Sequence, residues 1–369
     1  MVYQLCAMEG MGMSFENVDP NFWKSKKVFL TGHTGFKGGW LSYWLNAMGA
    51  EVTGYALPPN TSPNLFDLLN INDLIRQSYI ADIGNLAQLS QAVKDASPDV
   101  LIHMAAQPLV RYSYANPIET YATNVMGTAH VLEAARAVES LRATVVVTTD
   151  KCYENKEWLW GYREADQIGG RDPYSSSKGC AELVTQAYRE SFFLTGFNAV
   201  ASVRAGNVIG GGDWSEDRLI PDAIKAMETN QSLQIRNPNA TRPWQHVLEP
   251  LSGYLILAQK LYGVGQQYAG AWNFGPNDED VRSVAEVVSL LASKNEEFSW
   301  DFDRGVHHHE ANLLKLDCSK ARSLLNWTPR WNLEIAIEKI MEWHQVFRES
   351  GDVRQVTLNQ ISDFMSASK

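Results

Sequence analysis

Short apolar runs alternate with longer amphipathic segments through the first part of the chain. The apolar runs resemble strands that are buried on both faces of a sheet and span 27–31, 51–56, 99–103, 143–148 and 199–203. The amphipathic segments predict helices at 40–48, 86–96, 121–138 and 175–193. Strands that alternate with helices in this way predict an α/β fold with a Rossmann-like, doubly wound parallel sheet.

This regular alternation weakens after Arg204. Gly, Pro, Asn and Trp become frequent between residues 206 and 244, and helices are predicted at 247–262 and over most of 283–344. We therefore expect a Rossmann domain and a smaller α/β lobe, together with an N-terminal extension and a C-terminal tail. The expected bounds are 26–205 with a return of 244–272 for the Rossmann domain, 206–243 and 273–345 for the lobe, 1–25 for the extension and 346–369 for the tail.

Composition and charge argue against several classes of protein. The chain has 369 residues, of which 45% are hydrophobic and 20% are charged, as in an ordinary globular protein. A net charge of -10 argues against a nucleic-acid partner or an anionic membrane surface. No apolar run is long enough to span a bilayer, and the first twenty residues do not read as a signal peptide. The four cysteines lack paired spacing, so we expect reduced thiols and a cytoplasmic protein.

The first predicted strand ends in a glycine-rich turn, Gly32-His33-Thr34-Gly35-Phe36-Lys37-Gly38. Glycines at this spacing allow a tight turn, a close approach of the backbone to a pyrophosphate and close packing of the next helix. That helix then points its N-terminus at the anion. We expect a dinucleotide to bind here, with Asp82 and Ile83 near its adenine; a helix cap is the other interpretation of Asp82.

The acidic residue that would bind the ribose 2′-hydroxyl is missing. The region about twenty positions past the first glycine, residues 55–60, contains no Asp or Glu, but also no Arg or Lys for a 2′-phosphate. The sequence therefore favours NAD over NADP as the cofactor. Lys37 leaves NADP open, because Lys37 and His33 lie inside the phosphate loop, where a phosphate contact, a ribose contact or a solvated loop rim are all possible.

Tyr174 and Lys178 are four residues apart, so on a helix they share one face. A lysine close to a tyrosine favours the phenolate and lowers its pKa, and a phenolate can take a proton from a sugar hydroxyl. Such a pair is often only an exposed helix pair. Here Thr149 follows a buried strand, where an open α/β sheet presents its ligand crevice, and it could bond the same oxygen.

Together these features resemble the extended short-chain dehydrogenases, and the likeness runs from about Lys26 to His344. It rests on the phosphate loop, Thr149, the Tyr174/Lys178 pair and further short motifs. These are Ala105-Ala106-Gln107, Asn124 in Thr-Asn-Val-Met-Gly-Thr, Arg204-Ala-Gly-Asn207-Val-Ile-Gly-Gly-Gly-Asp213, Arg242-Pro-Trp-Gln-His-Val247 and Asn273-Phe-Gly275. The resemblance implies that Ala105, Ala106, Gln107, Asn124, Tyr174 and Lys178 contact NAD.

Asp150 points to a subclass within this superfamily. Hexose 4,6-dehydratases carry an acid beside the threonine that protonates the departing C6 hydroxyl, so the resemblance implies this role for Asp150. Where dTDP-glucose enzymes carry a glutamate base, this chain has Lys151, which leaves the C5 base open. The Asp-Lys-Cys-Tyr run, the Gly32–Gly38 turn and Arg242-Pro-Trp-Gln-His246 together resemble the branch that acts on CDP-glucose in deoxysugar and O-antigen precursor synthesis. Lys151 could serve as base only with a depressed pKa, and a structural partner of Asp150 is its other interpretation.

Residues that would bind the sugar nucleotide come mainly from the second half of the chain. Arg242 is expected at the diphosphate, with Arg218 and Arg304 as weaker candidates, because the planar guanidinium suits phosphate; surface ion pairs are the alternative. By resemblance, Asn207, Leu219 and Asn273 contact the nucleotide. The run His307-His-His309-Glu310 suits a substrate loop, with His308 as a contact, better than a metal site, so no metal is expected.

Assembly and rival functions complete the expectations. By resemblance, the helices at 121–138 and 175–193 pair across a two-fold axis, giving a homodimer or a dimer of dimers. The rival enzymes are a nucleotide-sugar 4-epimerase and a dehydratase for another nucleotide-linked hexose. A non-catalytic NAD-binding scaffold is the rival from another class, although such a scaffold would not need Thr149, Tyr174 and Lys178.

Overall fold

The computed structural model describes residues 16–295, 298–303, 305 and 312–367. Its centre is a sheet of seven parallel strands in the order β10-β6-β5-β4-β1-β2-β3. The strands are β1 (Lys27–Thr31), β2 (Glu51–Ala56), β3 (Gln77–Ile80), β4 (Val100–His103), β5 (Ala143–Val147), β6 (Ala199–Ala205) and β10 (Gly270–Phe274). The strand order reverses between β1 and β4, as in a doubly wound sheet, so the predicted fold class is confirmed.

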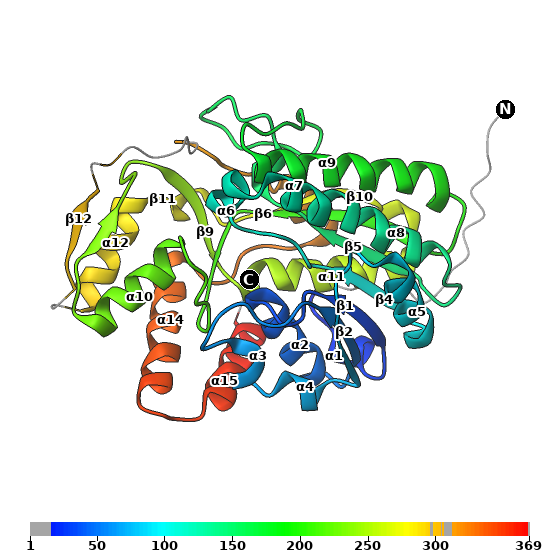
Figure 1. Cartoon of the computed structure of the whole chain (residues 1–369), viewed down its shortest axis with the longest axis horizontal. Helices are drawn as coiled ribbons and strands as arrows, with labels where there is room; N and C mark the ends of the chain where they lie inside the picture. The colour runs from blue at the N-terminus through cyan, green and yellow to red at the C-terminus, as the bar shows by residue number, and fades with distance from the viewer. Residues whose placement is uncertain (1–15, 296–297, 304, 306–311, 368–369) are drawn as a thin grey trace.

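Helices cover both faces of this sheet (Figure 1). One face carries α2 (Phe36–Ala47) and α11 (Leu248–Val264), and the other carries α5 (Leu86–Ala96), α8 (Gly127–Arg136) and α9 (Pro173–Tyr188). Every residue of β4 and β5 is buried, because both faces of these strands are covered. This burial explains why the central strands read as continuous apolar runs rather than as alternating ones.

Shorter helices and two wide turns complete the Rossmann domain. The short helices are α1 (Pro20–Trp23), α3 (Leu65–Leu68), α4 (Ile71–Leu74), α6 (Val110–Ala115), α7 (Pro117–Tyr121) and α13 (Ser319–Leu325). A π-helical turn at Ala122–Met126 joins α7 to α8, and a second one at Arg189–Phe193 continues α9. The helices predicted at 121–138 and 175–193 therefore each contain a turn that is wider than an α-helical one.

The smaller lobe has its own sheets and its own core. Its strands are β7 (Asn207–Ile209), β9 (Thr241–His246) and β11 (Val281–Ser283) in one sheet, and β8 (Leu233–Ile235) and β12 (Trp300–Phe302) in another. Its helices are α10 (Leu219–Thr229), α12 (Val284–Lys294) and α14 (Leu333–Arg348). Apolar side chains from these elements, such as Ile224, Leu291 and Ile337, form a separate buried cluster, so the lobe packs around a core of its own beside the large sheet (Figure 1).

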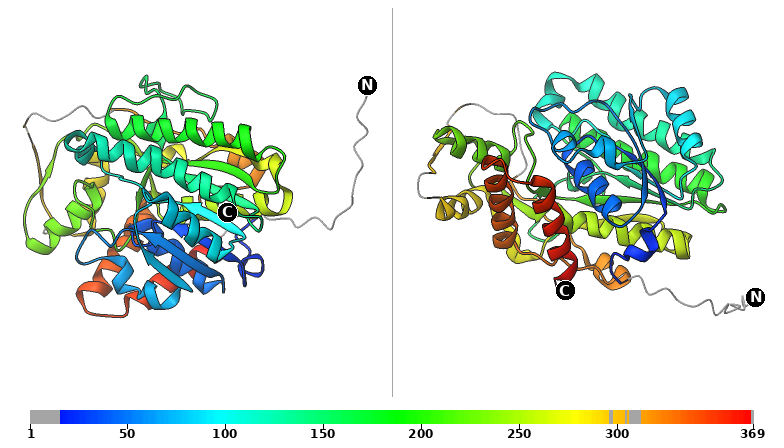
Figure 2. Two further views of the ribbon diagram at one scale, coloured as in Figure 1. Left: turned by 45° about the vertical axis from the view of Figure 1, so that its right-hand side comes forward. Right: turned by 90° about the horizontal axis from the view of Figure 1, so that it is seen from below.

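The described ends of the chain differ from the expected extension and tail. Helix α15 (Val353–Ser366) follows α14 and packs back on α2, where Phe364 contacts the ring of Trp44 (Figure 2). Near the other end, Trp23 is buried, and its indole N–H and the backbone N–H of Asp19 both donate to Gln259 of α11. The apolar side chains in both segments account for this packing, which the weak periodicity of the sequence concealed.

Three internal bounds also differ from those expected. Helix α13 packs on β10, so 319–325 belong to the Rossmann domain rather than to the lobe. Residues 244–246 belong to strand β9 and therefore to the lobe. Strand β10 extends the second segment of the Rossmann domain to Phe274. Among the described residues, no helix combines the length and the apolar character needed to cross a membrane.

Candidate active site

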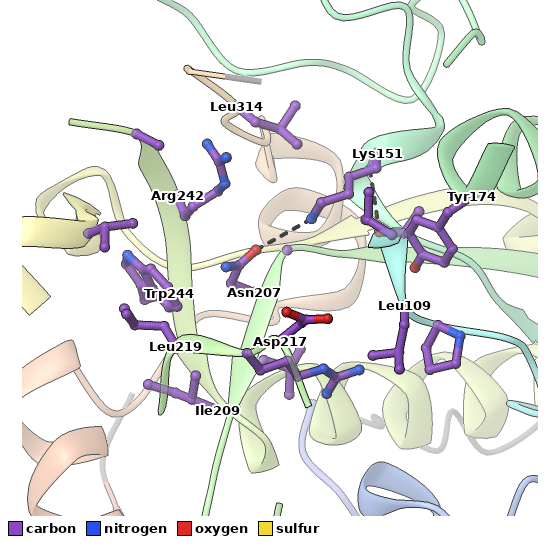
Figure 3. A pocket seen from close by; sticks show the side chains of 18 of the residues that line it. Leu109, Lys151, Tyr174, Asn207, Ile209, Asp217, Leu219, Arg242, Trp244 and Leu314 are labelled. Carbon is purple, nitrogen blue, oxygen red and sulfur yellow. Dashed lines mark hydrogen bonds between the residues drawn. The ribbon is translucent and has the colours of Figure 1, made fainter. Parts of the chain in front are cut away.

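A cavity of about 350 Å³ lies between the carboxyl ends of the sheet strands and the lobe. Thr149 and Tyr174 line it from the Rossmann domain. Figure 3 shows Arg242, Trp244 and Leu219 on the opposite wall. Ligand crevices in open α/β sheets form at this position, so the topology alone places the site here.

The glycine-rich turn has the shape that a dinucleotide needs. Gly32 has φ +79°, and a Cβ there would lie 2.7 Å from the backbone nitrogen of Ala105. A Cβ on Gly38 would lie 1.9 Å from the carbonyl oxygen of Gly32. Helix α2 starts after Gly35 with no side-chain cap and no acid in its first turn, so its N–H groups face the turn. These residues therefore fit a pyrophosphate held by backbone N–H groups.

The side chains of this loop lie in different surroundings. His33 is fully buried, its Nε2 lies in hydrogen bond 2.8 Å from Oγ of Ser78, and burial lowers its pKa to about 4. Its neutral ring packs on Gly54, so the imidazole lies against β2 rather than at the rim where a phosphate contact was expected. The Thr34 hydroxyl donates to Leu57, while the ring of Phe36 lies against Gly210.

Lys37 lines the cavity instead of the outer rim of the loop. Burial lowers the pKa of Lys37 to about 7, and the nearby charges of Arg218 and Lys178 act in the same direction. Asp150 and Asp213 oppose this shift only in part. Lys37 therefore brings an amine that is partly neutral near pH 7 to the wall of the cavity.

Asn124 lies in the π-helical turn and organises the segment after β4. Its Oδ1 accepts from the N–H of Gln107 at 2.9 Å, and its Nδ2 donates to the carbonyl of Gln107 and to Ser177 of α9. Ala105 donates to the hydroxyl of Thr31, which fixes the start of the same segment. Asn124 and Gln107 are buried, so they position the loop above β1 and β4. π-Helical turns often occur at functional sites, and this one provides the fixing residue.

Asp82 and Ile83, which were predicted to lie near the adenine, follow the carboxyl end of β3. Ile83 is buried, whereas Asp82 is exposed and accepts from the N–H of Gly84. Asn85, not Asp82, caps α5, so the helix-cap interpretation of Asp82 is wrong.

Tyr174 stands in the first turn of α9, which Asp172 caps and Pro173 opens. A hydrogen bond links its side chain to Thr149. Burial and the nearby Asp150 charge raise the pKa of Tyr174 to about 12, although the Thr149 contact opposes the shift. Lys178 donates to the carbonyl of Val147 at 3.3 Å, and burial lowers its own pKa to about 8. The expected lowering of the pKa of Tyr174 by Lys178 is therefore not found in this structure.

Asp150 is fully buried behind Thr149. Its Oδ1 accepts from the Thr149 hydroxyl at 2.9 Å and lies 3.5 Å from Nζ of Lys151, while its Oδ2 has no partner among the described residues. Lys151 lines the cavity, and its Nζ also lies 3.5 Å from Oδ1 of Asn207 (Figure 3). The cavity wall thus carries Thr149 and Lys151, and the carboxylate lies directly behind them.

The buried ion pair behind this site carries no sequence signature. Glu182, one turn after Lys178 on α9, accepts from Arg204 of β6 at 2.7 Å and from Ser202 at 2.7 Å, and it also binds Thr148. Arg204 donates in turn to the hydroxyl of Tyr153. The network joins α9 to the strand ends that precede Thr149, and neither residue was predicted to matter beyond the motif that contains Arg204.

The predicted substrate residues divide into three groups. Asn207, Arg218, Leu219 and Arg242 all line the cavity. Asn273 does not: it is fully buried, accepts from Tyr153 and donates to the carbonyls of Tyr162 and Asp317, so the predicted nucleotide contact is corrected to a structural role. Arg304, His308 and the rest of the histidine run lie outside the described residues.

The structure also brings to the cavity arginines that were not predicted. Arg111 of α6 and Arg236, which follows β8, line the cavity, and both pair with Asp217, at 2.7 and 3.4 Å. Arg218 pairs with Asp213 at 3.0 Å. Neither Arg111 nor Arg236 is part of a motif used in the prediction. Together with Arg242, they make this part of the cavity suitable for an anionic ligand.

The chain matches one protein family and several known proteins. A family model described as GDP-mannose 4,6 dehydratase matches residues 29–340. A CDP-glucose 4,6-dehydratase from Salmonella typhimurium is 52% identical over 356 residues, which cover 95% of this chain and 99% of that protein. The structure of Pal from Bacillus thuringiensis superposes with a TM-score of 0.77 at 23% identity, covering 87% of this chain and 99% of that chain. MoeE5, solved with UDP-glucose and NAD, gives 0.72 at 23% identity over 87% and 99% of the two chains.

Proposed function

The chain belongs to the GDP-mannose 4,6-dehydratase family of extended short-chain dehydrogenases, and on this basis we propose that it is an NAD-dependent CDP-glucose 4,6-dehydratase. It converts CDP-glucose to CDP-4-dehydro-6-deoxyglucose and water, with no net redox change. One structural observation supports the chemistry most directly: Thr149, Tyr174 and the Asp150–Lys151 pair meet at one cavity whose opposite wall carries arginines. The identity of 52% to the Salmonella enzyme supports the choice of CDP-glucose.

Oxidation at C4 needs a group that removes the proton of the C4 hydroxyl. Tyr174 is the proposed base, with Thr149 bonded to it and placed to hold the same oxygen. When bound, NAD supplies a hydride acceptor and a positive charge at its nicotinamide ring. A positive charge beside the phenol lowers its pKa, which offsets the raised value that burial gives Tyr174. Lys178 is proposed to contact the cofactor from the same helix.

The elimination needs an acid for the C6 hydroxyl and a base for the C5 proton. We assign the acid to Asp150, which reaches the substrate by way of the Thr149 hydroxyl, since Thr149 lies on the wall in front of it. The proton goes to the C6 oxygen as the C6–O bond breaks, and water leaves. Lys151 and Lys37 are the amines on the described cavity wall, and either can accept the C5 proton only in its neutral form.

The sugar nucleotide is proposed to lie across the lobe side of the cavity. Arg242 and Arg218 suit its diphosphate, because their planar guanidinium groups match phosphate oxygens. Asn207 and Leu219 line the same cavity and are proposed to contact the nucleotide.

A product assay tests the function against its rivals. The purified protein is incubated with NAD and, in separate reactions, with CDP-glucose, UDP-glucose and dTDP-glucose, and the alkaline absorbance of a 4-keto-6-deoxy sugar is followed. Absorbance that develops with CDP-glucose supports the proposal. Absorbance with UDP-glucose or dTDP-glucose instead would show that the substrate carries that nucleotide. Conversion of CDP-glucose to an epimer, without this absorbance, would indicate an epimerase. No conversion of any substrate would indicate a scaffold.

We further propose a homodimer that acts in the cytoplasm. Ile118 of α7, Met126 of the π turn and Leu183 of α9 leave 81%, 52% and 55% of their surface exposed. Helices α7 and α8 both contact α9, so these side chains suit pairing with the same helices of a second copy. Cys152, Cys180 and Cys318 are free thiols, which suits a reducing compartment.

A further inference from the structure

Five carboxylates line the described wall of the cavity, and four of them are already satisfied. Glu157 accepts from the N–H of Asn312, and Asp172 caps α9. Asp213 pairs with Arg218, and Asp217 pairs with Arg111 and Arg236. Asp222 alone accepts no hydrogen bond from any described residue. A half-buried carboxylate that lines a binding cavity and has no described donor is available to accept a hydrogen bond from a ligand.

The surroundings of Asp222 suit one part of the ligand better than the others. Asp222 lies in the first turn of α10, and the cavity there is lined by the apolar side chains of Leu219, Leu233, Ile235 and Trp244. Figure 3 shows Leu219 and Trp244 on the wall opposite Tyr174. Arg236 and Asp217 also lie near Asp222, so this wall combines apolar side chains with a few polar groups. Such a wall fits a flat aromatic base that carries hydrogen-bonding groups at its edge, whereas the arginines account for the diphosphate and the Tyr174 side accounts for the sugar.

We propose that Asp222 accepts a hydrogen bond from the exocyclic amino group of cytosine and thereby selects CDP-linked over UDP-linked and dTDP-linked sugars. This inference rests on the proposed function. Carboxylates are suitable acceptors for the 4-amino group of cytosine. Uracil and thymine carry an oxygen at that position, so two acceptors would face each other and the wrong nucleotide would be repelled.

The charge on Asp222 is consistent with this role. Burial and the nearby Asp217 raise the pKa of Asp222 to about 6, while Arg236 and Lys225 oppose the shift and Glu216 adds to it. At pH 7 the carboxylate is therefore mainly ionised, and an ionised carboxylate is a pure acceptor.

The test compares nucleotide binding in three proteins by titration calorimetry at pH 7.5, with saturating NAD. CDP and UDP are the probes, and the proteins are the wild type, Asp222→Asn and Glu216→Gln. Glu216 is exposed on the preceding loop and does not line the cavity, so Glu216→Gln controls for the loss of one negative charge. Asp222→Asn should lower the preference for CDP over UDP by about tenfold or more, the usual worth of a good base contact. An asparagine can turn its NH₂ toward the O4 of uracil, so UDP should bind no more weakly than it does to the wild type.

Each result has a defined meaning. A lost CDP preference in Asp222→Asn, with Glu216→Gln unchanged and unaltered thermal unfolding, supports the inference. A preference that survives in Asp222→Asn overturns the role of Asp222 and leaves the proposed function intact. Equal weakening of CDP and UDP also overturns it, because the carboxylate then binds a part that both nucleotides share. A wild type with no preference for CDP overturns the proposed substrate, and the inference with it.

Discussion

The hydroxyl of Thr149 donates a hydrogen bond to Oδ1 of Asp150 at 2.9 Å, so the residue proposed to hold the C4 oxygen is tied to the acid proposed for the C6 hydroxyl. Oxidation and elimination are therefore assigned to adjacent side chains on one short 3₁₀ turn, Asp150–Cys152. The two steps can be separated by changing only the second residue.

Asp150→Asn should slow product formation by about two to four orders of magnitude, because the C6 hydroxyl leaves slowly without a proton. The amide still accepts from Thr149, so C4 oxidation should continue and reduced nicotinamide should build up on the enzyme. Stopped-flow absorbance alongside product assay measures both. Asp95→Asn, an exposed change on α5, is the control. Product release at the wild-type rate would place the acid elsewhere.

Tyr174→Phe should lower turnover by at least about a hundredfold, because it removes the hydroxyl that is proposed to take the C4 proton. The ring is kept, so the fold and NAD binding should survive, as checked by circular dichroism and by fluorescence titration of the cofactor. Tyr43→Phe removes a hydroxyl that donates to Arg354, far from the cavity, and should leave turnover unchanged. Near-normal turnover in Tyr174→Phe would contradict its assignment.

Lys37→Met should stabilise the ligand-free protein most at low pH. Below about pH 7 the folded protein holds Lys37 as a buried ammonium, and the unfolded chain keeps that proton up to its ordinary pKa of 10.5. The unfolded state therefore binds more protons between these values, so the cost of Lys37 shrinks as pH rises through this window. Thermal unfolding at pH 6 and pH 9 measures the change. Lys94→Met, on the exposed side of α5, should show no such trend. An equal gain at both pH values would argue against a buried charge.

Glu182→Gln should destabilise the fold by about 3–5 kcal/mol, because it leaves the guanidinium of Arg204 buried without a counter-charge. Each side chain of this pair is only 4% exposed. Urea unfolding measures the loss. Glu51→Gln breaks the exposed pair with Arg76 and should cost less than about 1 kcal/mol. If both variants lose the same small amount, the network is not a stabilising element.

Leu183→Glu should convert the proposed dimer to a monomer, because it places a charge at the centre of the apolar face on α9. Light scattering at micromolar concentration gives the mass. Leu324→Glu changes a side chain that is 56% exposed on α13, away from that face, and should leave the dimer intact. A monomeric wild type would contradict the proposed assembly.

The sequence predicted the parts of this molecule that depend on local periodicity and on short motifs. Helix α5 begins and ends where its apolar spacing indicated, and the parallel, doubly wound sheet follows from the alternation of strands and helices. Thr149 lines the cavity because it follows β5 at the carboxyl edge of the large sheet, and Arg242 lines it from β9 of the lobe.

The parts of the site that the sequence did not predict depend on contacts between distant segments of the chain. The periodicity of the sequence contains no information about such contacts. His33 stands in a phosphate-binding motif, yet Gly54 leaves room for its ring on β2, and the ring is buried there. Asn273 stands in a substrate motif, yet its side chain is hydrogen-bonded to Tyr153, Tyr162 and Asp317 inside the protein. Asp222 is one acid among many in the sequence, and only the cavity distinguishes it.

The π-helical turn at Ala122–Met126 affects both the candidate active site and the face proposed for dimer pairing. Met126 lies eight positions after Ile118, and in a regular α-helix this spacing leaves the two side chains about 80° apart around the helix axis. The wider turn contains one residue more and reduces this offset, while it also places Asn124 against Gln107 and Ser177. A deletion that restored a regular helix would change the phase of every later side chain. In the proposed assembly, selection on catalysis would then preserve the same inserted residue that aligns Ile118 with Met126.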